Sequence, residues 1–417
     1  MALKSKFKSS FEDFEINLYK TLSNEEFDNL TNISDLKKSI KIDAFLEFIN
    51  FETRSQFINS NQDENIRYLK EFSKLPIVLI EASYEWFEII SKNEFIISIH
   101  GNHQVYLCLE SESNNFDNIK KQKSINEFSG KDVTIGLIDS GIDQSHPDLS
   151  NKVIRSYNVS GESKGDFNGH GTFLAGIFAG VAPEADIMDI KVFNKEGKAT
   201  VADILEGLDL VLSDIKENFP NIIVFGCADW LFDKKNLIAR YCELLNQCNI
   251  AIVTPTGNFG PDLGNTGSLA GNSNVLTVSA INKENKVPFF SGRSKGIDLF
   301  LLGKDVPSAI SSEHFIGTPL KHDSKHIVLS GTSISAATAG GMLALLKESN
   351  PNLTPSQLYK LIKKTSQDKR LPQINQITQK KILKKISTYS FSSIFKIASL
   401  ISGSILILFV ILFYLIG

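Results

Sequence analysis

Short apolar runs alternate with amphipathic stretches through the central part of the chain. The runs VTIGLID, ADIMDIKVF, IIVFG, IAIVTPTG and NVLTVSA are rich in β-branched residues, as buried strands are. Between several of them lie segments such as TVADILEGLDLVLSDIKENF, in which apolar residues recur at helical spacing. This alternation predicts an α/β fold over residues 128–376, with a largely parallel sheet covered by helices on both faces.

A smaller α/β unit is predicted over residues 38–112. The segments KKSIKIDAFLEFINF, LPIVLIEA, EFIISIHG and HQVYLCLE have the composition of strands. We predict helices over ETRSQFINSNQDENIRYLKEFSK and over SYEWFEIISKN, the second capped by Ser83. Residues 1–37 are a polar N-terminal segment, and residues 113–127 are a polar linker between the two units.

Residues 397–417 contain no charged side chain and are long enough for a helix that spans a bilayer. We predict a transmembrane helix here; the alternative is a buried core helix. The preceding segment, residues 377–396, is basic and either lies on an anionic membrane surface or is a solvated linker. By the positive-inside rule, its lysines place most of the chain on the cytoplasmic side of a single-pass, tail-anchored membrane protein. These lysines are Lys380, Lys381, Lys384, Lys385 and Lys396.

The composition narrows the classes of partner and compartment. The length of 417 residues indicates two or more folded units. The 44 basic and 47 acidic residues give a net charge of −3, which offers no general reason to expect nucleic acid as a partner. The four cysteines lack paired metal-ligand spacing and are too few for a disulfide framework, which favours a reducing compartment. The N-terminal residues show no apolar run typical of a secretory signal, so we do not expect general export.

Three short blocks carry the residue types of nucleophilic catalysis. Ser333 lies in LSGTSISAATAGGMLALL, at the predicted start of an apolar helix, although this block alone is equally typical of a tightly packed helix. Asp139 ends the strand VTIGLID, with Asp143 and Asp148 as nearby competitors, and His170 opens a helix in NGHGTFLAG. A serine nucleophile requires a base, and the base requires a carboxylate that orients it. Ser333, His170 and Asp139 can fill these roles.

The blocks Asp139-Ser140-Gly141, His170-Gly171-Thr172 and Gly331-Thr332-Ser333, in this order, resemble the signature blocks of the subtilases. These are the subtilisin-like serine proteases, peptidase family S8. The resemblance implies a subtilisin-like fold, with Asp139, His170 and Ser333 as the catalytic residues.

The same resemblance implies how the substrate is held. Asn258 in VTPTGNFG matches the donor of the oxyanion hole, although an Asn-Phe-Gly turn is the alternative. Five further residues match the family's substrate-binding edge segment and the walls of its specificity pocket: Gly226, Cys227, Ala228, Thr256 and Gly257. Pairing along such an edge reads the peptide backbone and suits flexible substrates.

The chain departs from the family's pattern at several positions. Subtilases usually have a proline four residues after the nucleophile, where this chain has Ala337, which leaves the placement of Ser333 relative to His170 open. Phe173 replaces the second histidine that is common after His-Gly-Thr, a change that we attribute to packing.

The calcium-binding insertion of many secreted subtilases is missing before Val181, so we expect no bound metal and no cofactor.

The unit over residues 38–112 resembles the inhibitory prodomains of subtilases, in which an α/β plug covers the active site and its tail lies in the substrate cleft. The resemblance rests on the patterning and on the stretches LPIVLIEA and ISIHGNHQVY. It implies that the N-terminal unit is a partner and inhibitor of the catalytic domain, joined to it by a cleavable linker. The alternative is a small interaction domain with no role in inhibition.

Together these features predict a membrane-tethered serine endopeptidase that hydrolyses peptide bonds through an Asp-His-Ser triad and an acyl-enzyme. We expect it to process selected peptides or proteins. The alternative is a catalytically silent subtilase-like module that acts as a membrane-bound interaction partner.

Overall fold

The computed structural model describes most of residues 38–365. The described residues are 38, 40–61, 63–108, 128–214, 219–228, 236–262, 264, 266–314, 316–317, 320 and 323–365. Segments 1–37, 113–127 and 377–396 and the predicted transmembrane helix 397–417 therefore lie outside the described residues. Within the described ranges, no helix is both long enough and apolar enough to cross a membrane.

The N-terminal unit is an antiparallel sheet with two helices on one face. Its four strands lie in the order β2-β3-β1-β4, and the helices pack on it through an apolar cluster that includes Phe48, Phe57 and Phe87. As the sequence predicted, the Ser83 side chain caps the second helix by accepting the N–H of Trp86 at 3.2 Å. The elements are β1 (Lys41–Phe48), α4 (Phe51–Ser60), β2 (Arg67–Glu71), β3 (Ile77–Ser83), α5 (Tyr84–Ile90) and β4 (Ile96–Gly101).

The helix predicted over residues 52–74 was wrong in its second half. Helix α4 ends at Ser60, and residues 67–71 form β2, which pairs with β3. Between them, Asp63 accepts the N–H of Asn65 at 2.9 Å and turns the chain. Pairing with β3 satisfies the backbone of this segment, and this tertiary contact outweighs the local helical spacing of its apolar residues.

The larger unit is built on a seven-stranded sheet, and the predicted α/β fold with a large parallel sheet is confirmed. The strands lie in the order β13-β12-β11-β10-β6-β8-β7, and every neighbouring pair is parallel. They are β6 (Thr134–Asp139), β7 (Val153–Asn158), β8 (Asp186–Lys191), β10 (Ile222–Phe225), β11 (Ala251–Pro255), β12 (Leu276–Ile281) and β13 (Leu299–Leu302).

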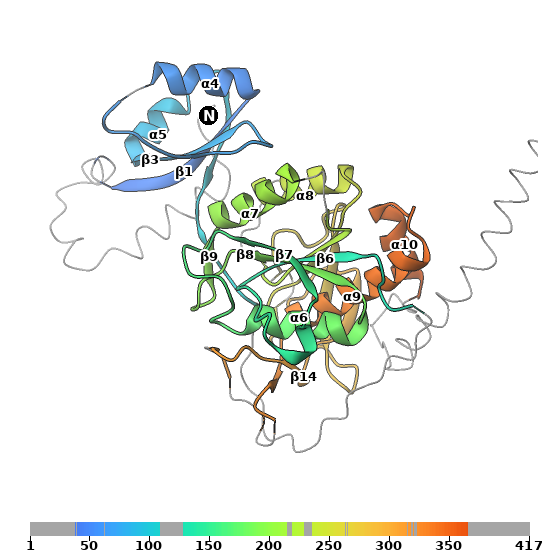
Figure 1. Ribbon diagram of the computed structural model, residues 1–417. Coiled ribbons are helices and arrows are strands. Elements are labelled where there is room, and N and C mark those ends of the chain that lie inside the picture. The colour runs from blue at the N-terminus through green and yellow to red at the C-terminus, as the bar shows by residue number, and fades with distance from the viewer. Residues whose placement is uncertain are drawn as a thin grey trace, which may run out of the picture.

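Helices cover both faces of this sheet (Figure 1). One apolar cluster joins one face to α6 (His170–Val181), α9 (Thr332–Ser349) and α10 (Pro355–Thr365). A second cluster joins the other face to α7 (Val201–Ser213) and α8 (Leu237–Gln247). The remaining elements are a 3-10 turn η1 (Pro147–Leu149), the strands β5 (Gln104–Tyr106) and β9 (Lys198–Thr200), and the pair β14 (Val306–Ala309) and β15 (His326–Leu329).

The N-terminal unit packs against α7 and α8 (Figure 1). Phe45 and Leu79 on the face of its sheet away from α4 and α5, and Leu75 between β2 and β3, belong to the same apolar cluster as these two helices. Asp209 of α7 accepts the backbone N–H groups of Ser73 and Lys74 at 3.2 and 3.1 Å. The two units therefore share one apolar core.

Buried polar groups also lie at this contact. Glu47 of β1 is 4% exposed and forms an ion pair with Arg240 of α8. The same carboxylate accepts hydrogen bonds from Ser98, and it lies 3.2 Å from Nε2 of the buried His100. Loss of such partners would leave a buried charge unpaired and would strongly destabilise the folded protein. These contacts therefore favour one docked arrangement of the two units.

Asp189 of β8 is a buried carboxyl group on the α6 side of the sheet. It is 4% exposed, and burial raises its pKa to about 8, with the negative charge of Asp166 adding to the effect. Ser156 of the neighbouring strand β7 is its hydrogen-bond partner. Asp189 is therefore largely protonated at neutral pH in the folded protein.

We predict that this group makes the fold less stable as the pH rises from about 4 to about 8. In that window the folded protein holds a proton that the unfolded chain has released, so the free energy of unfolding falls, by up to about 1.4 kcal/mol per pH unit. The variant Asp189→Asn keeps a hydrogen bond to Ser156 but cannot titrate. Denaturant unfolding at pH 5 and pH 8 should show a smaller loss of stability in the variant, and equal losses would contradict the assignment.

Candidate active site

The structure brings Asp139, His170 and Ser333 together at the carboxyl end of the sheet. Asp139 is the last residue of β6, His170 is the first residue of α6, and Ser333 is the second residue of α9. The His170 Nδ1 atom lies 2.9 Å from both carboxylate oxygens of Asp139, and Nε2 lies 3.0 Å from Ser333 Oγ. All three residues are completely buried. This is the arrangement in which an imidazole can accept the proton of a serine hydroxyl.

The competing carboxylates near Asp139 have other partners. Asp143 accepts hydrogen bonds from Ser145 and Ser312, and Asp148 Oδ2 lies 2.8 Å from His326 Nε2. Asp139 is the carboxylate that contacts His170.

Close backbone approach around Asp139 requires glycine at two positions. A Cβ at Gly226 would overlap Asp139 Oδ2, and a Cβ at Gly171 would overlap the carbonyl oxygen of Gly141. The sequence prediction placed Gly226 at the substrate-binding edge. The structure adds that its missing side chain leaves room for the carboxylate that orients His170.

Asn258 holds its side chain in a defined orientation. Its Oδ1 accepts both the backbone N–H of Thr332 at 3.0 Å and the Thr332 hydroxyl at 2.9 Å. Its Nδ2 is buried and has no hydrogen-bond partner among the described residues. An amide donor that is fixed and unpartnered beside a serine hydroxyl suits the binding of negative charge that develops only during a reaction.

The strand β5 of the N-terminal unit leads into this site. It pairs antiparallel with β9, and Leu107 and Cys227 then form an antiparallel bridge. The N–H of Cys108 donates to the carbonyl of Gly226 at 3.3 Å. Residues 104–108 thus lie as an extended segment between β9 and the predicted substrate-binding edge.

Cys108 ends this segment at the serine. Ser333 Oγ donates to the carbonyl oxygen of Cys108 at 2.8 Å. The Cys108 thiol contacts the backbone of Ala228 and Asn258 and the side chain of Thr332. Burial raises the pKa of this thiol to about 12, so it is a small group that is uncharged at neutral pH.

Thr256 and Gly257, the other predicted pocket residues, follow β11 and precede Asn258. Thr256 is completely buried, and its hydroxyl has no hydrogen-bond partner in the part of the chain that the structure describes. Gly257 has a φ of +88°, a conformation that glycine adopts readily. This turn directs the chain from the end of β11 to Asn258.

The departures at Ala337 and Phe173 are accommodated by packing. Ala337 is completely buried within α9, which begins at Thr332, and Ser333 lies within hydrogen-bond distance of His170. Phe173 belongs to α6 and is completely buried in the core. Over the described ranges, no three His, Cys, Asp or Glu side chains lie close enough together to hold a metal ion.

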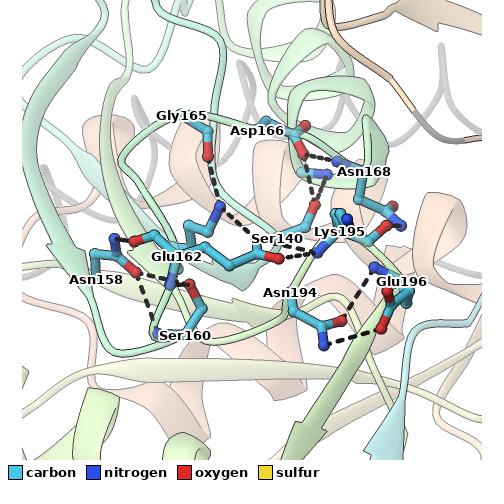
Figure 2. Close-up of polar contacts among 12 residues, drawn as sticks. Ser140, Asn158, Ser160, Glu162, Gly165, Asp166, Asn168, Asn194, Lys195 and Glu196 are labelled. Atoms are coloured by element: carbon cyan, nitrogen blue, oxygen red, sulfur yellow. Dashed lines mark hydrogen bonds and ion pairs between the residues drawn. The ribbon is translucent and has the colours of Figure 1, made fainter.

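Two polar residues, Ser140 and Asp166, lie behind the triad, and the sequence predicted a role for neither of them. Ser140 donates to Asp166 at 2.9 Å, and its hydroxyl also lies 3.2 Å from Asp139 Oδ1 (Figure 2). The signal that could have found Asp166 is an acidic residue four positions before His170, where a loop leads into a helix.

Comparison with known proteins places the chain in a family. A family model described as the Subtilase family matches residues 130–380. Serine protease AprX of Bacillus subtilis (strain 168) is 27% identical over 311 residues, which cover 66% of this chain and 70% of that protein. An intracellular serine protease of Paenibacillus polymyxa is 30% identical over 270 residues, which cover 58% of this chain and 76% of that protein.

A solved structure shares the fold. Fervidolysin from Fervidobacterium pennivorans, described as a keratinolytic enzyme related to subtilisin, matches with a TM-score of 0.65 and 18% identity. The match covers 79% of this chain and 58% of the fervidolysin chain. The family model and the named relatives together show that this chain belongs to the subtilases, the subtilisin-like serine proteases.

Proposed function

We propose that the chain is an endopeptidase that cleaves peptide bonds through a triad of Asp139, His170 and Ser333. Ser333 Oγ attacks the carbonyl carbon, and His170 Nε2 takes its proton and later gives it to the leaving amine. Asp139 orients the imidazole and stabilises its charged form. The observation that carries the proposal is the continuous contact from Asp139 through His170 to Ser333 at 2.9 and 3.0 Å.

Asn258 completes this mechanism as the donor to the oxyanion. Its unpartnered Nδ2 would bind the oxygen of the tetrahedral intermediate, a contribution of about 3 kcal/mol to transition-state stabilisation. Because Thr332 fixes the other end of the amide, the donor needs no reorganisation during the reaction.

We further propose that the N-terminal unit is an intramolecular inhibitor and the first substrate. Its support is the position of Cys108, whose carbonyl oxygen accepts the hydrogen of the nucleophile. A hydroxyl has one hydrogen, so while it donates to Cys108 it does not donate to His170. In this state the serine is not activated, and a small shift would place the carbonyl carbon of Cys108 for attack and release of the Cys108–Leu109 bond.

The contacts of residues 104–108 also support a proposal for the substrate class. Val105 and Cys108 are 2% and 3% exposed, whereas Tyr106 between them is 53% exposed. Main-chain pairing with β9 and with Cys227 leaves side-chain selection to the buried positions. We propose that the enzyme cleaves flexible, extended segments after a small uncharged residue.

We also propose that the enzyme is tethered to the membrane by residues 397–417 and faces the cytoplasm, where it processes selected peptides or proteins. The support is the uncharged C-terminal stretch and the lysines before it. The alternative of a catalytically silent module draws support from the same Cys108 contact, because a cleft that never clears would not turn over.

The proposed triad predicts that replacing Ser333 abolishes activity and that replacing Ser335 does not. Ser333→Ala should abolish labelling by a fluorophosphonate probe and lower peptide hydrolysis on the order of a million-fold, because the nucleophile is lost. Ser335→Ala removes another buried hydroxyl of α9, which donates to the Leu301 carbonyl, and should leave labelling intact. Labelling of both variants, or of neither variant nor the native chain, would contradict the proposed mechanism.

The proposed self-cleavage predicts a fragment that ends at Cys108. Mass spectrometry of the full chain should find it, and Ser333→Ala should remain uncut. Cys108→Asp should slow processing at least tenfold, because a carboxylate at this buried position loses its hydration. Gln104→Asp introduces the same charge at an exposed position of β5 and serves as the matched control. A fragment that ends elsewhere would refute the assigned position.

The proposed tether predicts how the protein fractionates. The full chain should stay in the membrane fraction after a high-salt wash, whereas a chain ending at residue 396 should be released, because only the uncharged stretch spans the bilayer. Protease added outside intact cells should leave the catalytic domain uncut. Recovery of the full chain in the soluble fraction, or digestion from outside, would rule out this placement.

A further inference from the structure

A second carboxylate lies directly behind the catalytic residues. Asp166 is 3% exposed and belongs to the loop between β7 and α6. Its Oδ1 accepts from Ser140 Oγ, Asn168 N and Gly169 N at 2.9, 3.1 and 2.8 Å. Its Oδ2 accepts from the backbone N–H and the hydroxyl of Thr172 at 2.9 and 2.6 Å. Five donors thus saturate one buried carboxylate.

Asp166 acts as the missing cap of α6. The N-cap residue of this helix is Gly169, which has no side chain to bind the free N–H groups of the first turn. Asp166 takes the N–H groups of Gly169 and Thr172 in its place, and its negative charge lies at the positive end of the helix. His170, the first residue of α6, lies between these two anchored positions.

Ser140 links this cap to the strand that carries Asp139. Its Oγ lies 2.9 Å from Asp166 Oδ1 and 3.2 Å from Asp139 Oδ1, and it accepts the N–H of Gly171 at 3.1 Å. Figure 2 shows Ser140 and Asp166 pointing toward one another. One hydroxyl thus joins the end of β6 to the start of α6, the two elements that supply the acid and the base.

The loop before Asp166 is held by a buried lysine. Lys191 of β8 is 2% exposed, and its Nζ donates to the carbonyl of Gly165 at 2.8 Å. The same ammonium lies 3.4 Å from Glu162 and over the ring of Phe167. Lys191 lies opposite Asp139 in the parallel pairing of β8 with β6. The loop is therefore anchored to the strand next to β6. Asp166 therefore lies on a segment with little freedom to move.

We propose that Asp166 is a positioning residue for the catalytic triad, which it serves through the Ser140 hydroxyl and the first turn of α6. Its side-chain contacts are with Ser140, Asn168, Gly169 and Thr172, and so it acts through other residues. The distance between Asp139 and His170 depends on how the end of β6 lies relative to the start of α6. Asp166 contacts both of these elements, through Ser140 and through Gly169 and Thr172. The substrate segment, by contrast, contacts β9, the edge at 226–228, and Asn258, Thr332 and Ser333. This proposal rests on the triad proposed above.

The role of Asp166 is tested by separating kcat from KM. Asp166→Asn keeps the shape of the side chain but cannot accept all five hydrogen bonds. We expect kcat to fall about 100-fold, which is the effect of displacing a catalytic group by about 1 Å. KM should stay within twofold, because the substrate contacts are untouched. Ser140→Ala should lower kcat about tenfold, and the double variant should be no worse than Asp166→Asn, because both act through one connection.

The matched control is Asp298→Asn at the other end of the sheet. Asp298 accepts the N–H of Thr277 at 3.0 Å and pairs with Lys363, so it is also a carboxylate bound to backbone. The control should lower the melting temperature by about 3 °C with kcat unchanged. If Asp166→Asn behaves like the control, or if its effect multiplies with that of Ser140→Ala, the positioning role is refuted.

A spectroscopic readout does not depend on turnover. In Ser333→Ala protein, the proton shared by His170 Nδ1 and Asp139 should give a downfield proton NMR signal, which reports this hydrogen bond directly. The signal should shift or broaden in Asp166→Asn and in Ser140→Ala and stay in place in Asp298→Asn. An unchanged signal in Ser140→Ala, which removes a single oxygen, would refute the proposal even if Asp166→Asn fails to fold. A native chain without turnover but with these NMR shifts would refute the proposed function and leave the positioning role standing.

Discussion

The contacts of the His170 imidazole with Asp139 and Ser333 are those on which the site depends. They join the end of β6, the start of α6 and the start of α9, three elements from separate parts of the sequence. All three side chains are buried. A buried polar group must have a hydrogen-bond partner, because its burial otherwise costs free energy. The parallel sheet meets this requirement, because its strands end at one edge and its helices begin there.

Around Asp139, His170 and Ser333, backbone segments approach closely and polar groups have hydrogen-bond partners. Gly226 and Gly171 leave the space into which Asp139 and the Gly141 carbonyl fit. Asp166 and Ser140 satisfy the first turn of α6, and Thr332 orients Asn258. In each case a group that does not react fixes one that is proposed to react.

The N-terminal unit uses two kinds of contact with the rest of the protein. Its sheet packs on α7 and α8 through apolar side chains and through ion pairs, such as that of Glu47 with Arg240 and that of Lys70 with Glu206. Its last strand and the residues that follow it pair through main-chain atoms with β9 and with Cys227. The first contact depends on the side chains of this surface, whereas the second depends on main-chain atoms, which every extended peptide has.

Much of the fold followed from local patterns. β-branched runs predicted the buried strands of the large sheet, and Ser83 predicted the start of α5, because burial and capping depend on neighbouring residues. The helix predicted over residues 52–74 failed because the strand β2 is stabilised by a partner strand that local periodicity does not register. Asp166 was missed for a similar reason, since its five donors come from two separate segments.

The sequence by itself determined the family and the residues nominated for the site, because the blocks around Asp139, His170 and Ser333 keep their residue types and their order. Only the tertiary structure decided that Cys108 meets Ser333, that Gly226 makes room for Asp139, and that Asp166 and Ser140 stand behind the triad. These are distances between residues far apart along the chain. They depend on how the strands and helices pack, which no local pattern of residues specifies.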